Sequence, residues 1–257
     1  MPILKIEGLT RDFGGLRALN SVAFNVQRGE ILGLIGPNGS GKTTLLNVIT
    51  GFLKTTEGNT VYKGNLLTGL KPHQIAKKGV TRTFQLTSLF PELTVKENIV
   101  RGRHLYSKSG FFGSLFQTKT YRKEEKRLNQ DVMDVLDFVN MMKKGDMIVK
   151  NLPAADQRIL EIAIALAAKP ELLLLDEPAS GMNLAEATGT MQLIRFIQQK
   201  GTTVVIVEHN MKVIMKLCSR IIVLNHGTII AEGTPSEISK NKEVIAVYLG
   251  KRREKDA

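Results

Sequence analysis

Apolar and polar positions divide the first part of the chain into short strands. Residues 4–7 and 21–26 alternate between apolar and polar side chains, which is typical of strands with one buried face. Residues 30–35 are almost entirely apolar, as expected for a strand buried on both faces of a parallel sheet. A glycine-rich turn and a helical pattern over 42–50 follow directly. The pattern predicts a central strand that leads through a tight turn into a helix.

The rest of the chain alternates between helix-like and strand-like stretches. Leu128, Val132, Val135, Leu136, Val139 and Met142 recur at steps of three and four, so they predict one apolar helix face within a helical region spanning about 95–168. We expect the polar end, 251–255, to be frayed. The remaining predicted strands are 58–63, 80–84, 171–175, 202–207 and 220–224, and the remaining predicted helices are 72–78, 184–200 and 210–218.

Composition limits the class of protein. The 257 residues are 42% hydrophobic and 23% charged, which suits a globular α/β protein of one large domain or two small lobes. We expect no bilayer-spanning helix, because no run approaches about 18 apolar residues. The first residues lack a basic region followed by an apolar one, and Cys218 is the single cysteine. We therefore expect a chain of the reducing cytosol, neither secreted nor membrane-integral.

The formal net charge of +12 indicates an anionic partner or a basic solvated surface. Nucleic acid, a lipid surface and a phosphate ligand all fit this charge. Aromatic residues make up 5% of the chain and tryptophan is absent, so little material exists for stacking single-stranded nucleic acid. Residues 101–127 carry about half of the net charge; they could contact a membrane partner or anionic headgroups, or form a solvated insertion.

The strongest local pattern is a phosphate-binding loop. Gly36-Pro37-Asn38-Gly39-Ser40-Gly41-Lys42-Thr43 matches G-x-x-x-x-G-K-S/T between an apolar strand and a helix. In such a loop, backbone N–H groups and the helix N-terminus point at phosphate oxygens. Lys42 would reach the β- and γ-phosphates and Thr43 would bind Mg²⁺. The alternative is a strand–turn–helix connection whose glycines are incidental.

A second part of a nucleotide site is predicted after another buried strand. Leu172 to Leu175 are apolar, and Asp176 and Glu177 follow them. The strand end would deliver both carboxylates to the ligand-binding edge of a sheet. Asp176 would serve Mg²⁺ and Glu177 would orient or polarise an attacking water. A solvated strand end is the alternative.

These motifs, in this order, resemble the ATP-binding subunit of an ABC transporter over almost the whole chain. The resemblance implies that Phe13 stacks on adenine, that Gln85 senses Mg²⁺ or water, and that His209 contacts the γ-phosphate. It places Ser180-Gly181-Met182-Asn183 at a loop that crosses a dimer interface. Taken singly, Phe13 could be a core residue, Gln85 a surface amide and His209 an ordinary histidine after a strand. The implied nucleotide contacts are Phe13, Gly36, Pro37, Asn38, Gly39, Ser40, Gly41, Lys42, Thr43, Thr44, Gln85, Ala154 and Ala155; the implied Mg²⁺ ligands are Thr43, Gln85 and Asp176; the implied catalytic residues are Glu177, His209 and Lys42.

Within that family, four segments look like the importer ATPases for branched-chain amino acids and related small polar solutes such as urea. They are Phe13–Leu19, Arg82–Gln85, Thr94–Asn98 and Val247–Gly250. The resemblance implies ATP and Mg²⁺ as cofactors. It also implies transmembrane permease subunits and a second ABC ATPase subunit as partners, a solute-binding protein as an indirect partner, and a peripheral position on the cytoplasmic face of the cell membrane.

One segment departs from the family pattern. The family signature LSGGQ should precede a helix that starts near residue 157, but the chain reads Leu152-Pro153-Ala154-Ala155-Asp156-Gln157-Arg158. A β-carbon at Ala155 could block a phosphate, and left-handed geometry there would add about 1 kcal/mol of strain. Asp156 would repel a phosphate at its helix N-terminus. The alternative is that Ala155 is accommodated and hydrolysis is only slower.

The expected fold is an α/β P-loop NTPase (ABC ATPase) with an antiparallel β subdomain and an inserted helical subdomain. We expect 1–95 and 169–240 to form the core with its β subdomain, 96–168 the helical subdomain, and 241–257 a C-terminal tail. The expected function is ATP hydrolysis that drives a permease. A regulatory ATP-binding subunit with impaired hydrolysis is the alternative. A nucleic-acid-associated ATPase is disfavoured, because neither tandem ATPase units nor a long coiled coil is present.

Overall fold

The computed structural model describes residues 1–83, 89–104 and 119–253. The chain forms two compact units. The first combines Met1–Arg82 with Glu171–Ala257, and the second is Thr83–Pro170.

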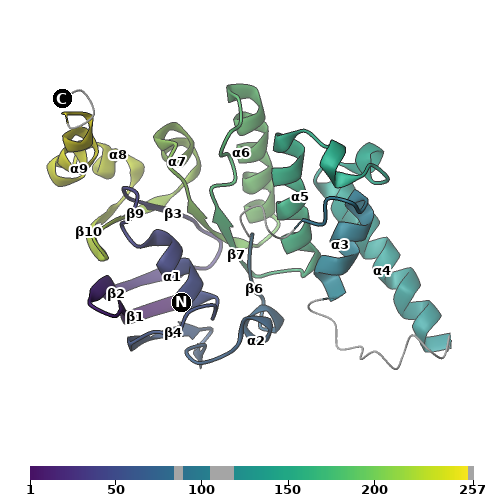
Figure 1. Cartoon of the computed structure of the whole chain (residues 1–257), viewed down its shortest axis with the longest axis horizontal. Helices are drawn as coiled ribbons and strands as arrows, with labels where there is room; N and C mark the ends of the chain where they lie inside the picture. The colour runs from purple at the N-terminus through teal and green to yellow at the C-terminus, as the bar shows by residue number, and fades with distance from the viewer. Residues whose placement is uncertain (84–88, 105–118, 254–257) are drawn as a thin grey trace. The chain divides into compact units, whose positions relative to one another are not determined.

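An antiparallel sheet of four strands begins the first unit (Figure 1). Its strands are β1 (Pro2–Phe13), β2 (Leu16–Gln27), β4 (Glu57–Tyr62) and β5 (Asn65–Leu66), in the order β2-β1-β4-β5. Val22, Phe24 and Val26 are buried while the residues between them are exposed, as the alternating pattern predicts. Both N-terminal strands extend well beyond the predicted segments, because they form one long hairpin from Pro2 to Gln27.

A second sheet of six strands carries the parallel part of the fold. Its strands are β3 (Ile31–Ile35), β6 (Val80–Arg82), β7 (Leu172–Asp176), β8 (Thr203–Val207), β9 (Arg220–Asn225) and β10 (Thr228–Gly233), in the order β10-β9-β3-β8-β7-β6. All neighbours pair in parallel except β9 and β10. The predicted central apolar strand is β3, and every one of its residues is buried.

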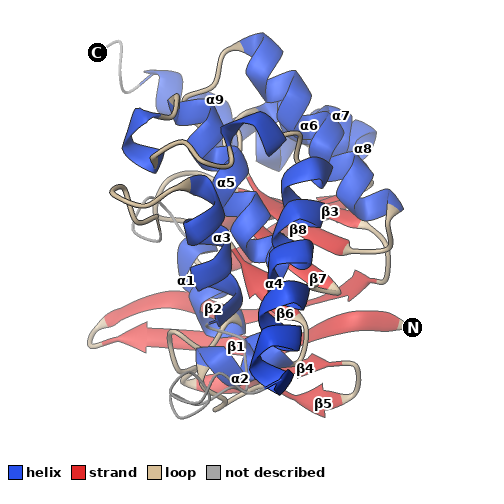
Figure 2. Ribbon diagram, turned by 90° about the vertical axis from the view of Figure 1, so that its right-hand side faces the viewer, coloured by secondary structure: helices blue, strands red, loops and turns tan. Residues whose placement is uncertain are grey.

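The two faces of β3 pack against different layers. Leu32 and Leu34 belong to a core cluster that also contains Leu45 and Leu46 of α1 (Lys42–Ile49) and side chains of the four-stranded sheet. On the other face, a β-carbon at Gly33 would lie 3.0 Å from the Cys218 sulfur, so α7 (Met211–Leu217) and its end pack closely there. Helix α6 (Leu184–Gln199) lies on the same side as α7 in both views (Figures 1 and 2). Helices on both faces of a mostly parallel sheet confirm the expected α/β class.

The patterns used above did not predict β10, α8 (Pro235–Lys240) or α9 (Lys242–Arg253). A capping box opens α8, in which Thr234 and Glu237 each accept a hydrogen bond from the other's backbone N–H. Asn241 accepts a hydrogen bond from Glu243 N–H at 2.9 Å at the start of α9. The end expected to fray from residue 251 is helical to Arg253. The Thr-Pro-Ser-Glu sequence at 234–237 was the sequence signal for this helix start.

The second unit is helical, as the pattern predicts. It contains α3 (Val95–His104), α4 (Lys119–Phe138) and α5 (Ala154–Ala167), with single 3₁₀ turns at Met142–Lys144 and Val149–Asn151. The side chains of Val132, Leu136 and Val139 are buried, in agreement with the predicted apolar face.

The prediction for Met142 is wrong, because this side chain is exposed. Helix α4 ends at Phe138, and Asn140 has φ 56°, a left-handed conformation that turns the chain. The helical period therefore does not continue, and the neighbouring Met141 is buried instead.

Much of the basic segment 101–127 lies outside the described residues, so the structure does not test its expected contacts. In the part of the chain that the structure describes, none of the helices combines the length and apolar character needed to span a bilayer.

Candidate functional site

The sheet order brings three predicted segments to one edge. Strand β8 lies between β3 and β7, and all three are parallel. Their carboxyl ends therefore face the same way. The glycine-rich loop follows β3, Asp176 and Glu177 stand at the end of β7, and His209 follows β8.

The loop after β3 needs glycine at its start for lack of space. A β-carbon at Gly36 would lie 2.1 Å from the Leu224 carbonyl oxygen and 2.6 Å from Ser40 Oγ. Gly41 has φ 105°, and a β-carbon there would lie 2.7 Å from the Ala18 carbonyl oxygen. Close packing of the loop on β9 and β2 requires glycine at these two positions, so these glycines are not incidental.

Lys42 lies across the inside of this loop. Its ammonium group donates hydrogen bonds to the carbonyl oxygens of Gly36 at 2.8 Å and Pro37 at 2.9 Å, and to Ser40 Oγ at 3.3 Å. The side chain is buried. A buried cation is therefore held in the concave side of the loop, where phosphate oxygens would compete with the carbonyl oxygens for it.

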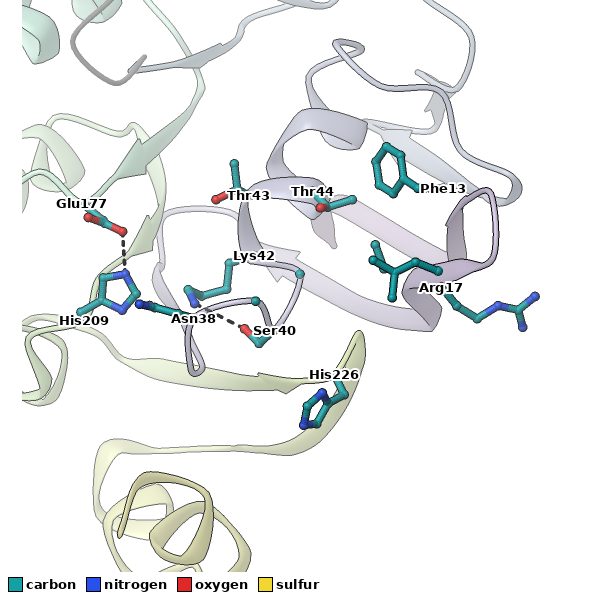
Figure 3. A pocket seen from close by; sticks show the side chains of 14 residues that line it. Phe13, Arg17, Asn38, Ser40, Lys42, Thr43, Thr44, Glu177, His209 and His226 are labelled. Carbon is teal, nitrogen blue, oxygen red and sulfur yellow. Dashed lines mark hydrogen bonds and ion pairs between the residues drawn. The ribbon is translucent and has the colours of Figure 1, made fainter. Parts of the chain in front are cut away.

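Helix α1 begins at the end of the loop without a side-chain cap. Thr43 is exposed and Thr44 is half-buried in its first turn. Figure 3 shows Glu177 and His209 on one side of the loop and Phe13 and Arg17 on the other. A helix N-terminus that has no side-chain acceptor and carries a lysine and two hydroxyl groups is suited to an anion.

Phe13 stands at the end of β1, and its side chain is 41% exposed, so it is no core residue. The guanidinium of Arg11 lies 4.5 Å from the centre of its ring. Arg17 instead pairs with Asp12, donating from Nε to Oδ1 at 2.9 Å and from Nη2 to Oδ2 at 3.2 Å. An exposed ring backed by a cation is a suitable platform for a flat aromatic ligand.

Glu177 and His209 form a direct contact. His209 Nε2 lies 2.6 Å from Glu177 Oε1, a hydrogen bond in which the tautomer protonated at Nε2 donates to the carboxylate. Glu177 has φ 49°, and its N–H donates to the Val207 carbonyl oxygen at 2.8 Å. A non-glycine residue in this conformation costs about 1 kcal/mol or more, and such strain is concentrated at functional sites.

Asp176 is buried beside a cation, Arg82, that is not among the predicted site residues. Arg82, the last residue of β6, donates from Nη2 to Asp176 Oδ2 at 2.6 Å and from Nη1 to Asn47 Oδ1 at 2.6 Å. The two side chains of the ion pair are 6% and 1% exposed. The sequence signal for Arg82 is its position three residues before Gln85, in the segment Arg82–Gln85 that resembles the family. Gln85 itself lies outside the described residues.

A second buried carboxylate, Glu208, was also missed. Its Oε1 accepts a hydrogen bond from Ala179 N–H at 2.7 Å, and its Oε2 accepts one from His209 N–H at 3.1 Å. Burial raises the pKa of Glu208, backbone N–H groups oppose that rise, and the charge of Glu177 adds to it. A charged residue directly after the apolar β8 was the sequence signal.

The turn between β9 and β10 and the last helix also reach the loop. Gly227 N–H donates to the Ser40 carbonyl oxygen at 2.9 Å, and His226 beside it lines the cavity at the loop. Burial raises the pKa of the Tyr248 hydroxyl in α9 to about 12, and a hydrogen bond with the Gly36 backbone opposes the rise. Residues near the end of the chain therefore contact the phosphate-loop candidate and support it.

A cavity of about 440 Å³ lies at the phosphate-loop candidate. The predicted members Phe13, Lys42, Thr43, Glu177 and His209 line it together. Asp176 and the backbone of Gly36 and Pro37 are not part of its lining. The full lining is Phe13, Leu16, Arg17, Ala18, Asn38, Gly39, Ser40, Gly41, Lys42, Thr43, Thr44, Glu177, His209 and His226.

In the second unit, the segment that departs from the family signature is the start of a helix. The family pattern predicts a loop before a helix that starts near residue 157, but α5 begins at Ala154, with Pro153 as its N-cap. Ala155 is not among the described residues with positive φ, so alanine introduces no left-handed strain. The early start has a simple cause: alanine favours helix, and glycine does not.

Asp156, in the first turn of α5, is neutralised within its own unit. Lys144 Nζ donates to both carboxylate oxygens of Asp156 at 2.7 Å. This ion pair reduces the repulsion that Asp156 would exert on a phosphate near the helix N-terminus. Ala154 is exposed and Ala155 half-buried, so the first turn is accessible.

Comparison with known proteins agrees with this geometry. Residues 19–180 match the family model described as "ABC transporter", and residues 228–254 match a model described as "Branched-chain amino acid ATP-binding cassette transporter". The chain is 42% identical over 250 residues, 97% of this chain and 98% of the relative, to the high-affinity branched-chain amino acid transport ATP-binding protein LivG of Salmonella typhimurium.

Solved structures share the fold. The ADP conformation of an ATP-binding cassette of an ABC transporter superposes with a TM-score of 0.86 and 32% identity, covering 97% of this chain and 99% of that one. A dimeric bacterial ABC transporter cassette superposes with a TM-score of 0.75 and 25% identity, covering 90% and 98%.

The fold and the site thus define a nucleotide-binding P-loop ATPase. More particularly, the chain belongs to the family of ATP-binding subunits of ABC transporters.

Proposed function

We propose that this chain couples ATP hydrolysis to import of branched-chain amino acids or a similar small polar solute. The observation that carries the proposal is the contact of Glu177 with His209 beside the Lys42 loop, in a chain 42% identical to a branched-chain amino acid transport subunit. The matched model at residues 228–254 supports the same solute class.

The residues would divide the work on ATP between them. Phe13 would stack on adenine, and the backbone and side chains of Gly36–Thr44 would surround the phosphates. Lys42 would exchange its carbonyl partners for β- and γ-phosphate oxygens. Glu177 would orient the attacking water and accept its proton, and His209 would hold Glu177 and contact the γ-phosphate.

The oxygen donors at this edge fit Mg²⁺. Thr43 contributes a hydroxyl and Asp176 a carboxylate, and among the described residues no cluster of three or more His, Cys, Asp and Glu forms a metal cage. Mg²⁺ commonly binds through one or two protein oxygens together with substrate phosphates. Thr43, Asp176 and, by family resemblance, Gln85 would hold it. When bound, the ion would neutralise charge on the β- and γ-phosphates.

The partners follow from the family. We infer that two cassettes assemble with transmembrane permease subunits at the cytoplasmic face of the membrane, and that a solute-binding protein delivers the solute. The dimeric cassette that this chain resembles supports a two-cassette assembly. Ala154 and Ala155 would then face the γ-phosphate bound by the second cassette through the N-terminus of α5. We expect no nucleic-acid partner.

Glu177→Gln tests the catalytic assignment. In proteoliposomes that contain the permease and the solute-binding protein, the variant should bind ATP normally and lose at least about 100-fold in turnover, because the amide cannot accept the proton of the attacking water. Radiolabelled leucine and urea, offered separately, test the solute class. Unchanged turnover would contradict the catalytic assignment. If neither solute is taken up when ATP is supplied, the proposed solute class is wrong.

A further inference from the structure

Glu208 is a buried carboxylate, and in the part of the chain that the structure describes its hydrogen-bond partners are all backbone N–H groups. Its exposed fraction is 3%. It accepts hydrogen bonds from Ala179 at 2.7 Å, from His209 at 3.1 Å and from Asn210 at 3.4 Å. Among the described residues no cation balances its charge. Burying a charge in this way is costly unless donors compensate it, so the three N–H groups are what hold it there.

The N–H groups that donate to the two oxygens of this carboxylate lie in different loops. Ala179 stands two residues after Glu177, in the turn that leads to Asn183, the N-cap of α6. His209 and Asn210 stand after β8, and Asn210 is the N-cap of α7. One side chain therefore joins the backbone behind Glu177 to the backbone that carries His209.

The same two loops also contact each other directly, without Glu208. His209 Nε2 and Glu177 Oε1 are 2.6 Å apart, and Glu177 N–H donates to the Val207 carbonyl oxygen. The side-chain contact, the backbone bond and the Glu208 carboxylate make a closed ring of hydrogen bonds around the end of β7 and β8. Glu208 itself is not among the residues that line the cavity, and it reaches that lining through its hydrogen bond with His209 N–H.

We propose that Glu208 is a positioning residue that fixes the loop of Glu177 and the loop of His209 as one rigid pair for ATP hydrolysis. The inference rests on the proposed roles of Glu177 and His209. A shift of the turn at Ser180, which family resemblance places at the dimer interface, is carried through the adjacent Ala179 and through Glu208 to the backbone of His209. Closure of the dimer and orientation of His209 are thereby coupled.

A carboxylate is the side chain that this position requires. Its two oxygens accept on both sides and donate on neither. Glutamine in its place would turn an NH₂ group toward Ala179 N–H or toward His209 N–H. Two donors would then face each other, and the hydrogen bond on that side would be lost. Aspartate is one methylene shorter and would not span both loops.

The decisive experiment combines turnover with amide exchange in the assembled transporter. Glu208→Gln should keep the Kd for ATP within about threefold and KM within about threefold, while kcat falls on the order of 10- to 100-fold, because a misplaced catalytic group costs rate rather than binding. Hydrogen exchange at Ala179 or His209 should accelerate, while amides in β7 and β8 stay protected. Glu171→Gln is the matched control, since that carboxylate pairs at the surface with Lys63 and Arg28.

A double-mutant cycle separates positioning from simple loss of stability. In a His209→Ala background, Glu208→Gln should lower kcat by less than about twofold further, because Glu208 acts on turnover through the pairing of His209 with Glu177, which this background already lacks. Full multiplication of the two single losses would overturn the proposal, as would unchanged kcat in Glu208→Gln. If Glu208→Gln does not fold, Glu208→Asp serves in its place, with the same exchange and cycle outcomes. Wild-type turnover in His209→Ala would instead defeat the role proposed for His209, while accelerated exchange at Ala179 would still report the Glu208 link.

Discussion

Arg82 donates from Nη2 to Asp176 Oδ2 at 2.6 Å with both side chains almost completely buried. The pair joins the last residue of β6 to the last residue of β7, and Asn47 of α1 accepts a second hydrogen bond from the same guanidinium. The carboxylate predicted to serve Mg²⁺ is thus held in place by a neighbouring strand and by the helix that follows the phosphate loop.

Removing Arg82 should destabilise the chain strongly. Arg82→Ala leaves Asp176 buried without this cation, and breaking one partner of a buried pair costs about 3–5 kcal/mol. We expect a fall of this size in the free energy of unfolding in urea. Arg28→Ala, which breaks an exposed pair with Glu171, should cost less than about 1 kcal/mol. Equal losses in the two variants would contradict the assignment.

Gly36 should tolerate no side chain. In Gly36→Ala the new β-carbon would lie 2.1 Å from the Leu224 carbonyl oxygen, so the loop must move. We expect ATP affinity to fall at least about tenfold and stability to fall by about 1–3 kcal/mol, as in other overpacked sites. Calorimetric titration with ATP and urea unfolding measure both. Gly64→Ala is the control, because its β-carbon would meet nothing within 4 Å and only the left-handed φ costs about 1 kcal/mol.

Ala155→Gly should leave turnover nearly unchanged. Ala155 already has helical geometry, and its N–H is oriented by α5 whether or not a β-carbon is present. We expect ATPase activity of the assembled transporter within about threefold of the wild type and a loss of up to about 1 kcal/mol in stability from the weaker helix former. A rise of tenfold or more would show that the β-carbon obstructs the second nucleotide, and would revive the regulatory alternative.

Glu208 should make stability fall as pH rises. Burial holds its pKa above the ordinary value in the folded chain, with Glu177 adding to the rise and the N–H groups of Ala179, His209 and Asn210 opposing it. The folded state therefore keeps a proton that the unfolded state releases above about pH 4.3, and the free energy of unfolding decreases between that pH and the raised pKa.

Urea unfolding at pH 5 and pH 8 checks this prediction. Wild type should lose more stability than Glu208→Gln on going from the lower to the higher pH, because the amide does not titrate. The histidines and other carboxylates are common to both chains and cancel in the comparison. A parallel change in the two chains would contradict the prediction.

The sequence predicted the parts of the site that use local patterns. Gly36 to Thr43, the strand before Asp176 and the strand before His209 were found because short motifs stand at the ends of apolar runs. The meeting of Glu177 and His209 at one edge follows from parallel pairing, which the strand pattern already implied. Resemblance to a family supplied Phe13, whose exposure agrees with a contact role.

The missed residues depend on pairing between distant segments. Arg82 and Asp176 are 94 positions apart, and Tyr248 reaches Gly36 from the last helix. No local period marks such partners. The start of α5 was missed for another reason: the family pattern suggested a loop, while the alanines in this chain extend the helix to Ala154.

The position of β3 has a consequence for how the chain is made. This strand, residues 31–35, lies between β8 and β9, so both of its neighbours come from after residue 202. The ribosome must therefore synthesise most of the protein before the two strands that flank β3, and with them the sheet that carries the phosphate loop, can form. The initial folding of the N-terminal hairpin can be early and local, whereas nucleotide binding should appear late in synthesis, after β9 has emerged.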